Sequence, residues 1–168
     1  MKRFLPIIAF LIILFFVFTC NSKDNEQVEG IPITNTSCNL YKSNPDSLSV
    51  PSDQSCINYS YDEVSKKLTF IHKNAAFNCC PGTIYYNPTA NDSLISIREF
   101  ETEGLCDCSC LYDLNMTISN VEARHYLVKF IEPYRGGQEE LVFDVDLINF
   151  PTGVYCVSRY NYPWGINK

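Results

Sequence analysis

Hydrophobic and polar residues alternate with a period of two through most of the chain from residue 38 onward. The alternation is clear over residues 56–61 and again over residues 67–72, where Leu68 and Phe70 fall on one face. Residues 62–66, between these segments, are polar and typical of a turn. Alternation places one face of a segment in a core and the other in solvent, and two such segments joined by a short turn form a β-hairpin. The pattern therefore predicts a hairpin at the start of the domain.

The same alternation recurs in further segments separated by turn residues. These segments are residues 93–100, 112–119, 125–131, 141–147 and 154–160, and the turn signals include Pro81-Gly82, Asn87-Pro88 and the run Arg135-Gly136-Gly137-Gln138. No long segment has the 3.6-residue period of an amphipathic helix. About eight short strands rich in Tyr, Phe, Ile and Val predict an all-β domain, either a sandwich or a barrel.

The start of the chain has a different pattern. Lys2 and Arg3 precede an apolar run over residues 4–18, which is too short for the roughly 20 residues of a membrane-spanning helix and fits a secretory signal. Residues 17–20, Val-Phe-Thr-Cys, resemble a bacterial lipobox, although Thr19 replaces the usual Gly, Ala or Ser. The resemblance implies cleavage before Cys20 and acylation of that cysteine by chains such as palmitate. An uncleaved signal anchor and ordinary secretion stay open as alternatives.

We therefore divide the chain into a signal peptide (1–19), a lipidated cysteine with a flexible tether (20–37) and a β-sandwich domain (38–168). Residues 21–37 are polar and lack periodicity, as in a flexible linker. Residues 22–26, Ser-Lys-Asp-Asn-Glu, resemble the acidic export tag of Bacteroidota surface lipoproteins. This resemblance implies a lipid-anchored outer-membrane protein, and the choice between surface exposure and a periplasmic orientation stays open.

The charge of the chain restricts its partners. The formal net charge of −6 counts Lys2 and Arg3, so removing these two positive charges leaves −8. A chain this acidic is not suited to binding nucleic acid, and it offers no basic face for an anionic bilayer. The expected membrane contact is therefore the lipid anchor.

Nine cysteines are an odd number for an exported protein, and assigning Cys20 to the lipid leaves an even set. That set is Cys38, Cys56, Cys79, Cys80, Cys106, Cys108, Cys110 and Cys156. If the triplet Cys106, Cys108 and Cys110 lies in a straight strand, its side chains point the same way, roughly 6.6 Å apart. Sulfurs on one zinc ion lie about 4 Å apart, so such a strand favours disulfides to neighbouring segments.

Up to four disulfides are then expected. Cys79 and Cys80 are predicted to pair each with one cysteine of the triplet, Cys38 with Cys56, and Cys156 with the remaining triplet thiol. The alternative is a zinc or copper site formed by the thiolates of the adjacent pair and the triplet, if the segment folds into a tight loop. These five ligand candidates are Cys79, Cys80, Cys106, Cys108 and Cys110. His72 and His125 are expected at strand surfaces or rims rather than as ligands.

The sequence contains none of the common catalytic motifs, and we expect a non-enzymatic protein. Asp144 and Asp146 share one strand face and are interpreted as solvent-facing charges. Glu99, Glu101 and Glu103 also alternate, and are interpreted as a solvated acidic edge that resists edge-to-edge pairing.

The C-terminal residues are aromatic. Tyr160, Tyr162 and Trp164 are the candidate contact patch for a protein or glycan ligand, because tyrosine and tryptophan dominate binding surfaces. The alternative is that this tail folds back and closes the core. A glycan-binding module and a metal-binding protein are thus the alternatives to a binding or structural module.

Two longer runs resemble known proteins. Residues 116–130 resemble the strand–corner–strand passage of immunoglobulin-like and fibronectin type III domains, which implies that Tyr126 hydrogen-bonds the upstream backbone and that Val121 is a core residue. Residues 78–81, Asn-Cys-Cys-Pro, together with Cys-x-Cys-x-Cys-Leu-Tyr-Asp at 106–113, resemble a group of uncharacterised Bacteroidota lipoproteins with Ig-like folds. The resemblance implies an Ig-like antiparallel β-sandwich and carries no activity.

Overall fold

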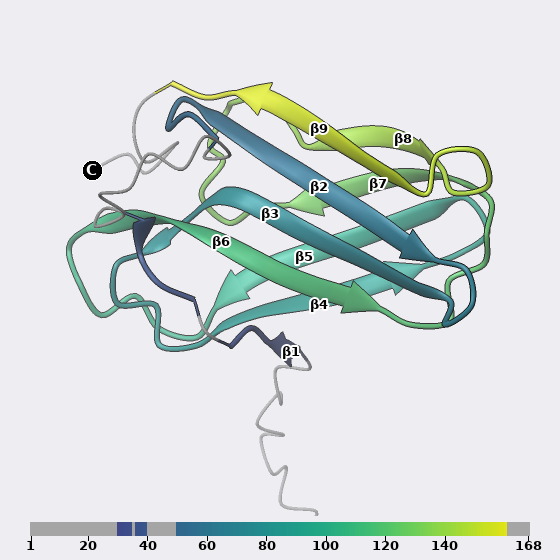
Figure 1. Cartoon of the computed structure of the whole chain (residues 1–168). Helices are drawn as coiled ribbons and strands as arrows, with labels where there is room; N and C mark the ends of the chain where they lie inside the picture. The colour runs from purple at the N-terminus through teal and green to yellow at the C-terminus, as the bar shows by residue number, and fades with distance from the viewer. Residues whose placement is uncertain (1–29, 35, 40–49, 161–168) are drawn as a thin grey trace, which may run out of the picture.

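In the computed structural model the chain forms two β-sheets packed face to face (Figure 1). The structure describes residues 30–34, 36–39 and 50–160. Its strands are β1 (Ile31–Pro32), β2 (Gln54–Asp62), β3 (Lys67–Asn78), β4 (Ile84–Ala90), β5 (Leu94–Glu101), β6 (Ser109–Ile118), β7 (His125–Ile131), β8 (Val142–Asp146) and β9 (Thr152–Ser158). Within these ranges no helix is long and apolar enough to span a membrane.

The five-stranded sheet has the order β1-β4-β5-β7-β8, and the four-stranded sheet has the order β6-β3-β2-β9. The predicted all-β sandwich is confirmed. One strand pair departs from the expected antiparallel arrangement, because β5 and β7 are parallel. Between them the chain crosses to the other sheet as β6, and each of the two connections reverses its direction, so β7 returns in the direction of β5.

Alternating side chains from both sheets fill the space between them. Leu68 and Phe70 of β3 point inward and are fully buried, as are Ile95 and Ile97 of β5 in the opposite sheet. The ring of Phe70 meets the ring of Phe130 edge to face, with centroids 5.5 Å apart. These contacts between the sheets are the apolar burial that stabilises a sandwich.

The segment over residues 84–90 forms a strand where the sequence predicts a turn at Asn87-Pro88. Pro88 lies inside β4, opposite Ile97 of β5. The short β1 reaches only Tyr85 and Tyr86, so β4 is a sheet edge at Pro88. A proline is tolerated at an edge because its missing N–H removes no inner ladder hydrogen bond. The predicted turn is therefore wrong.

Part of the expected tether belongs to the sandwich. Ile31 and Pro32 pair with β4, and Ile33, which is buried, donates its backbone N–H to the carbonyl of Ile84 over 2.8 Å. An apolar Ile-Pro-Ile run after a polar linker is the local signal for this edge strand. Residues 31–33, which the sequence analysis assigns to the flexible tether, therefore lie in the sandwich.

The corner before β7 has the hydrogen bond that the immunoglobulin resemblance implies. The hydroxyl of Tyr126 donates to the carbonyl of Glu122 over 3.1 Å. Val121 is buried, and its carbonyl accepts a hydrogen bond from the hydroxyl of Tyr61 over 2.8 Å. Two tyrosines therefore hold the β6–β7 connection against the sandwich.

Candidate functional site

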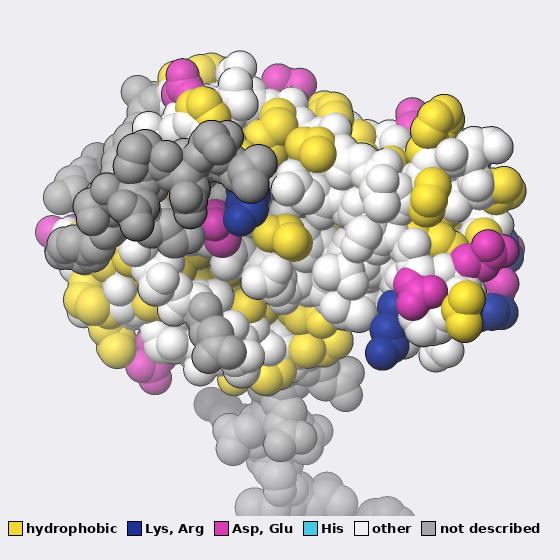
Figure 2. Space-filling model, in the orientation of Figure 1, with side chains coloured by type: hydrophobic (Ala, Val, Ile, Leu, Met, Phe, Trp, Pro, Cys, Tyr) yellow, Lys and Arg dark blue, Asp and Glu magenta, His cyan; other side chains and the backbone are white. Residues whose placement is uncertain are grey.

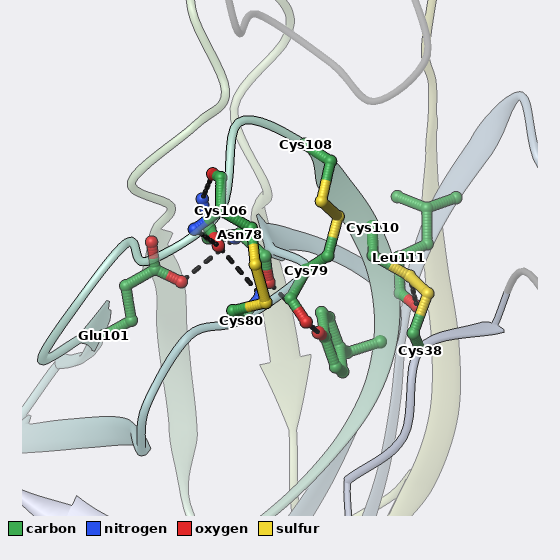
Figure 3. Close-up of a disulfide and its surroundings, with 10 residues drawn as sticks. Cys38, Asn78, Cys79, Cys80, Glu101, Cys106, Cys108, Cys110 and Leu111 are labelled. Carbon is green, nitrogen blue, oxygen red and sulfur yellow. Dashed lines mark hydrogen bonds between the residues drawn. A yellow bond between two sulfur atoms is a disulfide. The ribbon is translucent and has the colours of Figure 1, made fainter.

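Four disulfides join the eight cysteines that the sequence assigns to cross-links. They are Cys38–Cys110, Cys56–Cys156, Cys79–Cys108 and Cys80–Cys106. Figure 3 shows that three of them gather where the chain leaves β3 and enters β6. This end of the sandwich is therefore covalently braced.

The side chain of Asn78 organises the two adjacent disulfides. Its carbonyl oxygen accepts hydrogen bonds from the backbone N–H groups of Cys80, over 2.8 Å, and Cys106, over 3.2 Å. Its amide nitrogen donates to the carbonyl of Cys106 (Figure 3). One asparagine thus holds the two connecting loops together, and the Cα atoms of the paired cysteines lie 5.6 and 5.5 Å apart, within the usual disulfide range.

The predicted pairing is partly confirmed. Cys79 and Cys80 each pair with a member of the triplet, as expected. The predicted Cys38–Cys56 pair and the predicted bond from Cys156 to the triplet are wrong. Cys56 and Cys156 lie directly opposite each other on neighbouring strands β2 and β9, whereas Cys38 lies beside β6 and pairs with Cys110. These two pairings therefore follow from which segments are neighbours in the fold, and not from the separation of the cysteines along the chain.

The triplet does not form the straight ladder that the sequence analysis assumed. β6 begins at Ser109, so Cys106 and Cys108 lie in the preceding connection and only Cys110 lies in a strand. All five sulfurs of the alternative zinc or copper site are bonded to other sulfurs and offer no thiolate. Among the described residues, no group of three or more His, Cys, Asp or Glu side chains is arranged to hold a metal ion.

A second cluster of polar side chains lies buried between the sheets. It contains Ser55 of β2, His72 of β3, Glu99 of β5, Glu132 directly after β7 and Arg159 directly after β9. Ser55 and His72 are fully buried, and the other three side chains are almost so. Buried charges in a sandwich core require paired partners, so each contact in this cluster matters for stability.

The contacts form one connected network. The His72 ring places Nδ1 2.7 Å from Oε1 of Glu99 and Nε2 2.8 Å from Oγ of Ser55. Arg159 donates from Nη2 to both carboxylate oxygens of Glu132, over 2.9 and 2.7 Å. The two halves approach each other where Nε2 of His72 lies 3.9 Å from Oε1 of Glu132.

The order serine, histidine, carboxylate is that of a hydrolase triad, but the protonation state differs. Burial lowers the pKa of His72, whereas the charge and hydrogen bond of Glu99 and the charge of Glu132 raise it; despite a further lowering by Arg159, the net pKa is raised. The raised pKa favours the imidazolium, which donates from both nitrogens and cannot accept a proton from Ser55. The geometry therefore describes a buried ion cluster in which two acidic residues, Glu99 and Glu132, face His72 and Arg159.

This cluster corrects two predictions. His72 was expected at a strand surface or rim, and Glu99 on a solvated edge, yet both are buried. The signal that identifies them is strand parity. His72 shares the inward face of β3 with Leu68 and Phe70, and Glu99 shares the inward face of β5 with Ile95 and Ile97. Ser55 shares its face with Ile57 in the same way.

The other candidate residues lie elsewhere. Glu101 accepts a hydrogen bond from the hydroxyl of Tyr134, and Glu103 is exposed. Asp144 is exposed 3.7 Å from the exposed His125, and Asp146 accepts backbone hydrogen bonds in the turn that follows β8. These two aspartates form no buried dyad, in line with their interpretation as solvent-facing charges.

The predicted lipidation site and most of the aromatic patch lie outside the described residues. Of the three aromatic candidates, Tyr160 is described and is 64% exposed, whereas Tyr162 and Trp164 are not described. Cys20 and the signal segment 1–19 also lie outside the described ranges.

The fold and its cross-links define a disulfide-braced, two-sheet β-sandwich of the kind found in oxidising compartments outside the cytoplasm. No family model, no curated protein and no solved structure matches this chain.

The buried ion cluster predicts that the fold weakens as pH rises. The raised pKa of His72 means that its contribution is complete below the unfolded value, about 6.5, and is lost as pH rises through the folded value. Burial raises the pKa of Glu132, against the opposing charges of His72 and Arg159, and this also favours folding at lower pH. The urea midpoint should therefore fall between about pH 6 and about pH 9.

The measurement pairs urea unfolding with an NMR titration of the imidazole. Substituting His125→Asn removes the other histidine, so the remaining ring signal belongs to His72. Hydrogen bonds from Ser65 and Asn149 lower the pKa values of the Asp62 and Asp146 carboxylates, so their contribution to stability is lost only as pH falls into a more acidic range. A His72 ring that titrates below 6.5 would contradict the predicted charge state.

Proposed function

We propose that this protein is a non-enzymatic binding or structural module, exported from the cytoplasm and held at a membrane by acyl chains on Cys20. The observation that supports export most strongly is the set of four disulfides, which use every cysteine except Cys20. Disulfides persist in oxidising compartments and are rare in the cytosol, where thiols stay reduced. The unpaired ninth cysteine is then available for a lipid.

The chemistry of the interior supports a non-enzymatic role. The one serine–histidine–carboxylate arrangement among the described residues is buried, and the raised pKa of His72 favours the protonated ring, which is not a base. In this proposal the charge-paired side chains fix the relative position of the strands that carry them. The sandwich is then a rigid body, and any partner binds at its surface.

The location proposed for the module is the outer membrane. The basic residues Lys2 and Arg3, the apolar run 4–18 and the lipobox-like residues 17–20 support lipoprotein processing. More than one acyl chain is needed for stable anchoring, because each buried methylene contributes about 0.8 kcal/mol. The acidic residues in the segment after Cys20 support display at the cell surface.

The test is a comparison of the wild-type chain with a Cys20→Ser variant in a Gram-negative host that processes lipoproteins. The wild type should incorporate labelled palmitate and partition into Triton X-114, and the variant should do neither. Denatured wild-type protein should show no free thiol, since the lipidated cysteine carries a thioether. Equal partitioning of the two chains, or several free thiols, would contradict the proposal, and protease treatment of intact cells would distinguish surface from periplasmic exposure.

A further inference from the structure

In the described part of the chain, four strands lie at the outer ends of the two sheets, and three of these terminal strands are protected against pairing with another chain. β1 has only two residues, one of them Pro32, and β8 has five residues that include Asp144 and Asp146. Shortness, proline and charge are the usual devices that keep a sheet edge from adding a strand.

The edge of β6 is blocked by other parts of the chain. The hydroxyl of Tyr86, from the opposite sheet, donates to the carbonyl of Thr117 over 3.0 Å and accepts from its N–H over 3.2 Å. Near the other end of β6, Cys38 is bonded to Cys110, and Asn39 donates a hydrogen bond to Asp113. The Tyr86 hydroxyl and the segment that contains Cys38 and Asn39 thus cover the β6 backbone with which an added strand would pair.

β9 has none of these devices. Its seven residues, Thr152–Ser158, contain no charge and no proline, and on one side they pair with β2 while no described strand pairs with the other side. Exposed apolar side chains accompany the strand: Val154 is 66% exposed, Phe150 just before it 66%, and Tyr160 just after it 64%. In Figure 2, hydrophobic side chains, with some acidic ones among them, lie along the upper rim, where Figure 1 places β9.

The hydrogen-bond pattern shows which backbone groups this edge presents. Cys56 and Cys156 lie opposite each other with Cα atoms 4.1 Å apart, which is the close, non-hydrogen-bonded type of antiparallel pair. The N–H and C=O groups of Cys156 therefore point away from β2. By alternation, Thr152, Val154 and Ser158 also present theirs outward. The bond from the Arg159 N–H to the carbonyl of Asp53, in the turn just before β2, agrees with this alternation.

We propose that β9 pairs antiparallel with β9 of a second copy of this chain, about a two-fold axis at Tyr155. Val154 then lies opposite Cys156 of the second copy, and Thr152 lies opposite Ser158 of the second copy. In this register every outward N–H and C=O of β9 meets an outward group of the other strand, and the two four-stranded sheets become one continuous sheet.

The side chains favour a second copy over an unrelated strand. The same two-fold axis places Phe150 of each copy opposite Tyr160 of the other, so the exposed apolar groups at both ends of β9 cover each other. A two-fold interface must be self-complementary in this way. The chain has a net charge of −6, and an edge without charge is where two acidic copies approach with least repulsion.

The first test is sedimentation equilibrium of the full chain in density-matched detergent. The wild type should be a dimer, and Val154→Lys and Val154→Pro should each raise the dimer dissociation constant at least tenfold. The N–H of Val154 points away from β2, so proline there removes no bond of the β2–β9 ladder, and circular dichroism should stay unchanged. Val64→Lys, at a valine 96% exposed in the β2–β3 turn, is the matched control and should leave the dimer intact.

The second test addresses the register. Phe150→Lys and Tyr160→Glu should each weaken the dimer, and the double variant should restore it, because lysine of one copy then faces glutamate of the other. Within one chain these positions are roughly 33 Å apart along an extended strand, so the rescue cannot arise inside a single copy. A monomeric wild type, a dimer insensitive to Val154 substitution, or an edge occupied by an extended segment of another protein would each overturn the proposal.

Discussion

Replacing Arg159 by methionine should lower the free energy of unfolding by about 3–5 kcal/mol, because the buried Glu132 carboxylate then loses the cation that contacts both of its oxygens. Methionine keeps most of the side-chain volume, so the loss reports the charge more than a cavity. Urea unfolding at neutral pH gives the change directly.

Two further variants separate this effect from a general loss of charge. Lys66→Met breaks the exposed Lys66–Glu122 pair and should leave the free energy of unfolding almost unchanged, because solvent screens both charges. Adding Glu132→Gln to Arg159→Met removes the unpaired carboxylate and should recover part of the loss, which a double-mutant cycle measures. If Arg159→Met costs no more than Lys66→Met, the interior charges do not hold the fold in the way described.

Removing the Cys56–Cys156 disulfide by substituting both residues with alanine should cost about 4–5 kcal/mol. The bond joins positions 100 residues apart, and a closure of that length restricts the unfolded chain by about this amount. The other three disulfides leave a long path between these two positions, so none of them replaces the lost constraint. Thermal and urea unfolding under non-reducing conditions measure the difference.

The Cys79–Cys108 disulfide is the matched comparison. Cys80–Cys106 closes almost the same loop, so with that bond intact the Cys79–Cys108 bond adds the closure of only a few residues. Alanine at Cys79 and Cys108 should therefore cost roughly half as much as alanine at Cys56 and Cys156. Equal losses would show that strain or packing, rather than chain entropy, dominates the contribution of these bonds.

The sandwich could be predicted from the sequence because alternation marks most of its strands directly. The prediction from alternation failed at β4, because Asn87-Pro88 has the composition of a turn. There the proline is tolerated only because β1 stops at Pro32 and leaves that part of β4 at an edge. Whether a strand is central or at an edge depends on its neighbours in the sheet, which a local pattern does not specify.

The disulfide pairing also depends on which strands are neighbours in space, and the local sequence does not specify these neighbours. The link between Cys79-Cys80 and the triplet could be predicted because both lie in short motifs at strand ends. The Cys56–Cys156 bond depends on β9 adding next to β2 after the chain has crossed between the sheets several times. No rule of spacing along the chain selects that partner.

The buried ion cluster could have been found from strand parity but not from residue type. Glu99 alternates with Glu101 and Glu103, which indicates a charged edge, and it also alternates with Ile95 and Ile97, which indicates the core. The second pattern is correct because Arg159 and His72 arrive from distant strands to balance the charge. A sequence read segment by segment cannot reveal that compensation.

The Cys38–Cys110 bond also determines how the molecule responds to mechanical load. A force applied to the chain ahead of Gly30 can strip away β1, which has only two residues, both exposed and paired with β4. The pull then reaches Cys38, and the covalent bond passes it to β6, the strand beside β3. A domain tethered at its N-terminal end would thus resist further unfolding from that end after β1 is lost, because the disulfide transfers the load to β6 in the body of the sandwich.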